Sequence, residues 1–303
     1  MNKNKICLIG GGHGLSGILG GMKEYSYLSA VVDVTDAGGS TGKLRNKFNC
    51  PAMGDIRICL DSLGDAKLKD IFERRIKDYG DCIGNLIIAS LIKLYDFDTA
   101  IKIMHKLLGL KDTHRIIPIS LDIFDVQGEY RSGKIVKKEN EFIEEDKIEK
   151  VWIEPKGKVN PEAIQAIKEC DYVIVAPGSF YTSILINFLL PEISEEVNKK
   201  KIIWIVNTMQ QKGETIGMDA NEHAAVLLRY LDHIDYVLVN NTKPLESELK
   251  IANYEGYLMP LLHLDKNDKI KHIIEKDLIK YNALGVVHSP NKVKRILREI
   301  IHD

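Results

Sequence analysis

The fold of this chain is decided by the stretch Lys5-Ile-Cys-Leu-Ile-Gly10-Gly-Gly-His-Gly14-Leu-Ser16. Its short apolar run ends in glycines, which is typical of a parallel strand buried on both faces, and glycine allows the tight turn that follows. We expect residues 14–23 to form a helix and residues 30–34 to form a second strand. Strand, glycine turn, helix and strand make a βαβ unit, so the sequence predicts a parallel sheet with a right-handed crossover.

The alternation of strands and helices returns after residue 160 and frames two insertions. Further helices are expected at residues 161–170, 219–232, 245–253 and 290–301, and further strands at 172–175, 202–206 and 236–239. Residues of about 54–110 carry helical periodicity and predict a helical insertion. Residues of about 115–153 predict a β-hairpin insertion, with an apolar strand first and turns at Gln127-Gly128 and Ser132-Gly133. We therefore expect one domain over residues 1–303, a Rossmann-like, doubly wound α/β fold around a mainly parallel sheet.

Composition excludes several classes of protein. The 303 residues carry 42 Lys and Arg against 43 Asp and Glu, so no basic excess exists to drive nucleic-acid binding. The five cysteines form no C-x-x-C pair, which argues against a disulfide framework or a structural zinc site. No apolar run reaches the roughly 20 residues that a membrane helix needs. We expect a cytoplasmic protein without membrane insertion, and a homodimer because symmetric dimers are the commonest oligomers.

The first polar cluster is the glycine turn itself, where Gly11, Gly12, His13 and Gly14 are candidate phosphate-binding residues. Glycines let backbone N–H groups approach an anion closely, and the N-terminus of the following helix attracts negative charge. From Gly12 the turn also fits G-x-G-x-x-G, with Asp33 or Asp36 near the end of the next strand, which is the dinucleotide fingerprint. The alternative is that these glycines only pack the helix tightly on the strand.

A second glycine-rich loop, at residues 35–43, follows the second strand. Asp36 is a candidate catalytic residue and metal ligand, or a partner for a sugar hydroxyl. Candidate phosphate-binding residues in this loop are Gly38, Gly39, Ser40 and Thr41. Serine and threonine are also good N-caps, so a capped helix start is the alternative.

Three more candidates come from the predicted helical insertion. Asp55 is a candidate catalytic residue or the N-cap of the helix that follows. Arg57 is a candidate for a bidentate phosphate contact, or it pairs with a structural carboxylate. Asn85 is a candidate ligand-binding residue or a buried amide satisfied by backbone. If Arg57 binds phosphate, Arg57→Ala is expected to weaken ligand binding with little loss of stability.

Two further clusters directly follow strands. The first begins a helix with small polar residues and is a candidate anion site, with Gly178, Ser179, Tyr181, Thr182 and Ser183 as the binding residues. In the second, at residues 207–215, the amides of Asn207 and Gln210 are candidates for reading a base or a sugar edge. Glu214 in the same segment is either functional or a helix cap.

Taken in this order, the clusters resemble the family of the 2-phospho-L-lactate transferase over nearly the whole chain. The family pattern runs G-G-G-T-G-L-S, D-D-G-G-S-S-G-R-L-R, P-P-G-D-I-R-N-C-L, G-N-L, G-P-G-S-L-Y-T-S-I-L-P-N and N-x-M-T-Q-P-G-E-T. The counterparts here are residues 10–16, 36–45, 54–60, 84–86, 177–187 and 207–215. Residues 38–42 and 181–185 look more like the YvcK-like branch of this CofD-like family, the bacterial gluconeogenesis factors.

The resemblance implies two functions of different classes. The YvcK-like branch implies a cytosolic regulatory factor that binds a UDP-sugar such as UDP-GlcNAc and is linked to gluconeogenic growth, cell-wall synthesis and cell shape. The transferase branch implies an enzyme that moves a phospholactyl group from a guanosine diphosphate donor to a deazaflavin acceptor with Mg²⁺, with Asp36 and Asp55 as candidate metal and catalytic residues. A nicotinamide dehydrogenase, based on Gly12-x-Gly14-x-x-Gly17 alone, is a third reading.

The chain departs from the family pattern at several positions. His13 replaces a threonine of the first loop, and Ala37 replaces the second aspartate of the Asp pair, which removes a carboxylate that a Mg²⁺ site would use. Ile58 replaces an asparagine, and Val287 replaces an arginine near the C-terminus. These departures weaken the catalytic reading and favour ligand binding by a divergent member.

Overall fold

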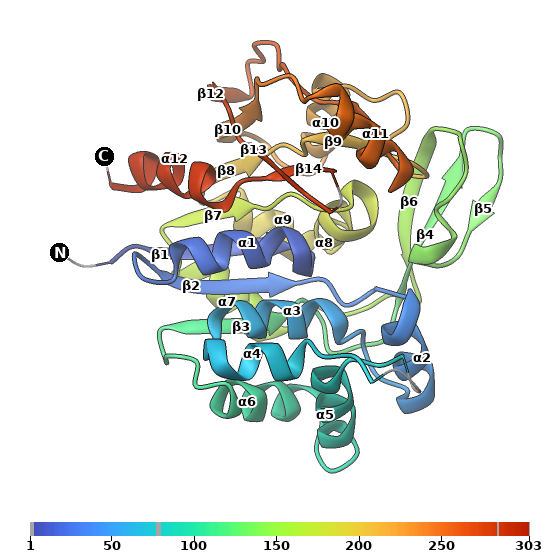
Figure 1. Cartoon of the computed structure of the whole chain (residues 1–303), viewed down its shortest axis with the longest axis vertical. Coiled ribbons are helices and arrows are strands. Elements are labelled where there is room, and N and C mark those ends of the chain that lie inside the picture. Colours follow the sequence, from blue (N-terminus) through green and yellow to red (C-terminus); the bar gives the residue numbers. More distant parts are fainter. Residues whose placement is uncertain (1–2, 77–79, 284, 303) are drawn as a thin grey trace.

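The computed structural model describes residues 3–76, 80–283 and 285–302, and its centre is a seven-stranded parallel sheet (Figure 1). From one edge to the other the strands are β12 (Ile270–Lys276), β10 (Ile234–Asn240), β8 (Lys201–Ile205), β7 (Tyr172–Val175), β1 (Lys5–Gly10), β2 (Tyr27–Val32) and β3 (His114–Pro118). Each neighbouring pair is parallel. The chain builds outward from β1 to β3 and then returns to start the other half at β7. This order confirms the Rossmann-like, doubly wound fold.

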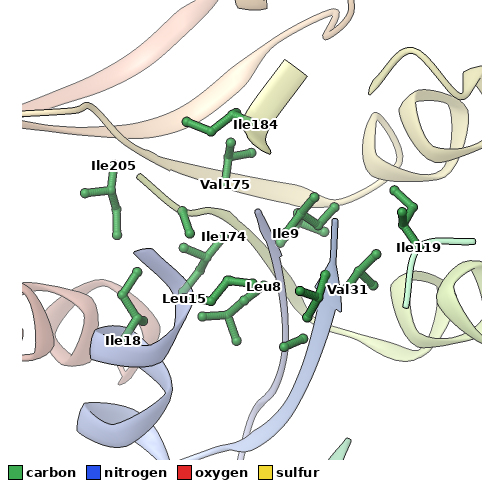
Figure 2. Close-up of a cluster of buried hydrophobic side chains, with 14 of the residues drawn as sticks. Leu8, Ile9, Leu15, Ile18, Val31, Ile119, Ile174, Val175, Ile184 and Ile205 are labelled. Atoms are coloured by element: carbon green, nitrogen blue, oxygen red, sulfur yellow. The ribbon is translucent and has the colours of Figure 1, made fainter. Parts of the chain in front are cut away.

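The central strand β1 is buried because helices cover both faces of the sheet. Leu8 and Ile9 point to opposite faces, and both are fully buried. Figure 2 shows them among Val31, Ile174 and Val175 of the neighbouring strands, with Leu15 and Ile18 of helix α1 (Gly12–Met22) to one side. The continuous apolar run of β1 is therefore what a strand covered on both faces requires.

Helices form the two outer layers. Helix α1 packs between α3 (Gly54–Leu63) and α12 (Pro290–His302), and these three lie in front of the sheet in Figure 1. Helix α7 (Pro161–Glu169) packs against α9 (Pro191–Val197) behind it. The predicted helical insertion is confirmed between β2 and β3, but it begins before residue 54, at α2 (Gly39–Phe48). It continues with α3, α4 (Ala66–Phe72), α5 (Ile83–Ile92) and α6 (Phe97–Leu107).

The predicted hairpin insertion begins later than residue 115. Its first segment is β3, the edge strand of the central sheet, which pairs with β2 in parallel at Leu28 and His114. The antiparallel sheet that follows contains β4 (Asp125–Tyr130), β5 (Ile135–Val136) and β6 (Ile148–Glu154), with the 3-10 turn η1 (Glu139–Glu141) between β5 and β6. We call residues 125–154 the arm; it extends to one side of the molecule in Figure 1.

One of the two predicted turns in the arm is wrong. Gln127 and Gly128 lie inside β4, where glycine is needed because a Cβ at Gly128 would lie 2.7 Å from the ring of Phe142. The other turn is confirmed: the N–H of Gly133 donates to the carbonyl of Tyr130, and Gly133 has a φ of +85°.

The C-terminal half adds short elements around the sheet. They are the π-helix η2 (Phe180–Leu185), α8 (Ile186–Phe188), β9 (Met209–Gln211), α10 (Ala220–Leu227), α11 (Glu246–Tyr254), β11 (Tyr257–Pro260), β13 (Ile279–Asn282) and β14 (Gly285–His288). The antiparallel pairs β9–β11 and β13–β14 share a second small core with α11. None of the helices in the described chain is long and apolar enough to cross a membrane.

We predict that Gly14→Ala destabilises the fold through α1. A Cβ at Gly14 would lie 1.6 Å from the carbonyl oxygen of Pro177, so the helix must move away from the loop after β7. We expect the free energy of unfolding to fall by at least about 3 kcal/mol. Gly20 is the matched control because it is exposed on the same helix and a Cβ there meets nothing closer than 3.9 Å.

Gly20→Ala should leave stability unchanged or raise it by up to about 1 kcal/mol. Urea denaturation of the two variants and the wild type measures both effects. Equal effects at Gly14 and Gly20 would show that helix propensity, and not the contact with Pro177, decides the residue at Gly14.

Candidate functional site

A cleft of about 840 Å³ opens at the carboxyl ends of the central strands. It lies where the strand order reverses between β1 and β7, which is where ligands bind in open α/β sheets. The predicted site residues that line it are Gly11, Gly12, His13, Gly14, Asp36, Thr41, Asp55, Arg57, Asn85, Gly178, Ser179, Ser183 and Asn207. The structure thus brings most of the separate clusters to one place, as the convergence of strand ends predicts.

The glycines of the first cluster let α1 pack closely where it starts in the cleft. A Cβ at Gly12 would lie 2.7 Å from the Cα of Asp55, and Gly14 faces Pro177 as described. The N–H of Gly12 donates to the carboxylate of Asp55, so this side chain neutralises part of the positive charge at the N-terminus of α1. Close packing of α1 is therefore enough to explain why residues 12 and 14 are glycines, although both also line the cleft. His13 is exposed at the cleft wall.

The second cluster reaches the cleft only in part. Asp36 lines the cleft, and its Oδ1 accepts a hydrogen bond of 2.8 Å from the N–H of Gly38. Thr41 lines the cleft close to Gly54. Gly38, Gly39 and Ser40 are not among the cleft-lining residues, because α2 begins at Gly39 and turns this part of the loop away.

Arg57 is held by two residues of the helical insertion. Its Nη1 lies 2.6 Å from Oδ2 of Asp61, and its Nε donates to Oδ1 of Asn85 at 3.0 Å. Burial raises the pKa of Asp61 to about 6, although Arg57 lowers it. Of the two roles predicted for Arg57, the structure shows the ion pair with a structural carboxylate. The sequence did not identify Asp61 as that carboxylate. Arg57→Ala would leave the buried carboxylate of Asp61 unpaired, so from the structure we expect this variant to lose stability.

The N-terminus of η2 is occupied by a carboxylate of the chain itself. Glu214 accepts the N–H of Tyr181 at 2.8 Å, the N–H of Thr182 at 3.3 Å and the hydroxyl of Thr182 at 2.8 Å. Tyr181 and Thr182 are buried and do not line the cleft, so the structure does not bring them together with the other predicted ligand-binding residues. Of the two readings of Glu214, the structure shows the helix cap.

The sixth cluster fixes one strand end to another. The side chain of Asn207 accepts the N–H of Gly178 at 3.2 Å and donates to its carbonyl at 2.7 Å. Gln210 is buried and donates to the carbonyl of Met218, so it does not reach the cleft. Gln211 lines the cleft instead and donates to the hydroxyl of Ser179. The sequence placed no strand at β9, whose alternation sends these two glutamines to opposite sides.

Several cleft residues were not assigned from the sequence. They are Asp33, Arg75, Glu139, Gln211, Lys280 and His288. Asp33 had a signal, because it directly follows the second strand where a dinucleotide site carries an acid. Glu139, Lys280 and His288 come from the arm and from β13–β14, which local sequence patterns do not place beside the glycine turns.

The charges of the cleft are uneven. Burial, followed by repulsion from Asp55, raises the pKa of Asp33 well above its ordinary range. Burial likewise raises the pKa of Asp55, and burial together with Asp36 raises that of Glu139 to about 7. We call these three side chains the acidic wall; Arg57 and Arg75 of the helical insertion line the cleft as well. Burial lowers the pKa of His288 to about 4, so this histidine is neutral near pH 7.

A divalent cation fits this wall only with help from a ligand. Among residues 3–76, 80–283 and 285–302, no group of three or more His, Cys, Asp or Glu side chains is arranged to hold a metal ion. Mg²⁺ is usually held by one or two carboxylates together with substrate phosphates and water. Asp36 and Asp55 line the cleft and suit that mode, in which a phosphate ligand completes the coordination.

Comparison with known proteins agrees with this fold and places the chain in a family. The family described as 2-phospho-L-lactate transferase CofD matches residues 6–279. The "Gluconeogenesis factor" of Bacillus subtilis is 33% identical over 99% of each chain. An Aquifex aeolicus relative, named provisionally for the same role, is 35% identical over 100% of this chain and 98% of its own. The crystal structure of protein BH3568 from Bacillus halodurans matches with a TM-score of 0.90 at 29% identity, covering 100% of both chains.

We predict that Glu214→Ala destabilises the protein because it leaves two N–H groups and one hydroxyl without their buried acceptor. The expected loss in the free energy of unfolding is at least about 3 kcal/mol. Glu214→Gln should lose less, since an amide oxygen still accepts. The exposed Glu255→Ala is the control and should stay within about 0.5 kcal/mol of the wild type. Equal stability of Glu214→Ala and the control in urea would contradict the capping role.

We predict that Glu139 makes stability fall with rising pH. Its pKa is raised from 4.5 to about 7 in the folded chain, so it favours folding below pH 4.5, and that contribution is lost as the pH rises toward 7. The free energy of unfolding of Glu139→Gln should therefore fall less between pH 4.5 and pH 7 than that of the wild type. Glu141→Gln, on the same turn and exposed, should follow the wild-type curve. Identical curves for all three proteins would rule out a raised pKa at Glu139.

Proposed function

The chain belongs to the 2-phospho-L-lactate transferase CofD family, and from that premise we propose that it is a regulatory factor that binds a nucleotide sugar in the switch-point cleft. The observation that carries the proposal is the cleft itself, which has about 840 Å³ at the carboxyl ends of parallel strands. That volume is in the range of small-molecule sites, and the position is the one that α/β folds use for nucleotides. A UDP-sugar such as UDP-GlcNAc is the ligand we propose.

The centre of the cleft suits a diphosphate. The backbone of Gly178 and Ser179 and the first turn of α1 face the cleft between its two sides. Arg75 and Lys280 line the cleft and are exposed, so they can approach the phosphates without a folding cost. Lys280 lies on β13, whereas Arg75 belongs to the helical insertion after β2.

Binding is favoured over catalysis by what the two candidate catalytic carboxylates do. Asp36 accepts the N–H of Gly38, and Asp55 accepts the N–H of Gly12, so both fix helix starts. Ala37 offers no carboxylate beside Asp36. These observations support a binding role. A cytoplasmic location and the links to gluconeogenic growth, cell-wall synthesis and cell shape are part of the proposal.

The raised pKa values of Asp33 and Asp55 favour a second candidate function, a Mg²⁺-dependent phospholactyl or nucleotidyl transferase. A cation stabilises the charged form of carboxylates whose pKa is raised by burial. Asp36 and Asp55 would hold Mg²⁺ with the ligand phosphates, and the ion would neutralise charge on the diphosphate.

The two functions are separated by thermal stabilisation of the purified chain. The ligands are UDP-GlcNAc, UDP-glucose, GTP, GDP and NADH, each with and without Mg²⁺. We expect a metal-independent stabilisation by the UDP-sugars, worth about 2.7 kcal/mol at 100 times the dissociation constant. Stabilisation by guanosine nucleotides that requires Mg²⁺ would favour the transferase, and stabilisation by NADH alone would favour a dehydrogenase.

Lys280→Ala tests where the phosphates lie. Because Lys280 is exposed in the cleft, its removal should weaken UDP-GlcNAc binding roughly three- to fivefold without a change in the melting temperature of the unliganded chain. Lys266→Ala is the control, since this lysine is exposed in the loop before β12 and does not line the cleft. If calorimetry finds the same affinity in Lys280→Ala as in the wild type, the phosphates do not bind beside β13.

A further inference from the structure

The cleft extends past the glycine turns to the place where α1, β8, β14 and α12 meet. Helices α1 and α12 are in contact there, since a Cβ at Gly17 would lie 3.5 Å from the ring of Pro290. Figure 2 shows Ile18 and Ile205 at the same edge of the core, and both line the cleft. Val287 and Val293 add further apolar surface from β14 and α12. Surroundings of this kind suit a flat, largely apolar part of a ligand.

Polar side chains also reach this end of the cleft. Ser16 donates its hydroxyl within its own helix, and Asn207 is bonded to the backbone of the loop after β7. Lys280 and Asn282 come from β13, which pairs with β14. His288 is the last residue of β14, and its contacts fix which of its ring atoms a ligand meets.

We infer that this end of the cleft holds the base of the nucleotide, and that His288 is a specificity-determining residue for it. Nδ1 of His288 accepts a hydrogen bond from a ring N–H of the base. The ligand class is therefore nucleotides of uracil or guanine, whose rings carry such an N–H, in preference to those of cytosine or adenine. This inference rests on the proposed function, because it requires a nucleotide in the cleft.

The tautomer of His288 follows from its contact with the end of β8. Its Nε2 lies 3.0 Å from the carbonyl oxygen of Val206. A carbonyl only accepts hydrogen bonds, so Nε2 carries the proton, and Nδ1 of the neutral ring is an acceptor. Burial lowers the pKa of His288 to about 4, so the ring stays neutral and keeps this acceptor at pH 7.

The acceptor Nδ1 is open to a ligand. Over residues 3–76, 80–283 and 285–302, Val206 is the hydrogen-bond partner of the His288 ring, and none reaches Nδ1. His114 shows the contrasting case, because both of its ring nitrogens are buried without a partner. Nδ1 of His288 is not buried in this way, and His288 lines the cleft. A ligand that covers Nδ1 without offering a donor would leave it unsatisfied, which opposes binding.

A single acceptor beside apolar side chains suits a group with a single proton. A ring N–H is satisfied by one acceptor, whereas the amino group of cytosine or adenine carries two protons. The ring nitrogen next to that amino group is itself an acceptor, so against Nδ1 neither atom would have a donor. The position also agrees with the proposed phosphate contact, since Lys280 lies opposite Val287 on the neighbouring strand.

The test compares UDP with CDP, which differ only at this edge of the base. Dissociation constants are measured by calorimetry at pH 7 for the wild type, His288→Phe and His272→Phe. We expect the wild type to bind UDP at least about tenfold more tightly than CDP. His288→Phe keeps an aromatic ring without an acceptor, so the ratio should fall to about threefold or less, mainly through weaker binding of UDP.

His272→Phe is the matched control. His272 stacks on Tyr236 and does not line the cleft, so this variant should keep the wild-type ratio. Equal binding of UDP and CDP by the wild type, or a ratio that His288→Phe leaves unchanged, overturns the inference. Either result leaves the proposed function standing, because UDP still binds. If UDP, CDP and UDP-GlcNAc all fail to bind the wild type, the proposed function fails and the inference with it.

A measurement on the wild type covers the case in which His288→Phe does not fold. In protein labelled with ¹⁵N-histidine, the resonance of an unprotonated ring nitrogen should move upfield when UDP binds, because Nδ1 then accepts a hydrogen bond. CDP at saturation should not produce this shift. If no such resonance moves on saturation with UDP, Nδ1 does not accept from the base and the inference is overturned.

Discussion

The structure depends on one constraint: the helix starts that a parallel sheet brings to its carboxyl edge must have their free N–H groups satisfied. Here, side-chain carboxylates of the protein itself accept several of these N–H groups. Asp55 accepts the N–H of Gly12 at the start of α1, and Asp36 accepts that of Gly38 before α2. Glu214 accepts those of Tyr181 and Thr182 in η2. Each contact joins segments that are separate in sequence or orders a loop, so the cleft and the fold share the same interactions.

The consequence for function is a cleft that already contains anions where many nucleotide-binding folds leave room for phosphate. Burial and mutual repulsion raise the pKa of Asp33, Asp55 and Glu139, so these groups are not fully compensated in the unliganded chain. A ligand that brings hydroxyl donors or a cation to this wall relieves that cost. A ligand that brings only negative charge increases it, and its phosphates must lie toward the centre of the cleft.

The sequence predicts most of the fold because the βαβ units are local. The strands at the centre of the sheet lie within a few residues of the predicted ranges. The strand β3 was assigned to the hairpin because an apolar run such as Ile116-Ile117 does not identify the strand with which it pairs. Its partner β2 lies on the other side of the whole helical insertion in the sequence. The edge strand β12 was missed because Ile270–Lys276 mixes apolar with charged residues, as an edge strand does.

The site was less predictable than the fold because its glycines serve two purposes. Gly12 and Gly14 are required by contacts with Asp55 and Pro177, so a glycine-rich turn by itself does not identify a phosphate site. The residues that give the cleft its charge are set by long-range contacts: Glu139 comes from an arm more than a hundred residues beyond the turn. Ligand chemistry must therefore be argued from the assembled wall. That wall is built of acceptors, which favours a ligand with uncharged donors over one that offers only anions.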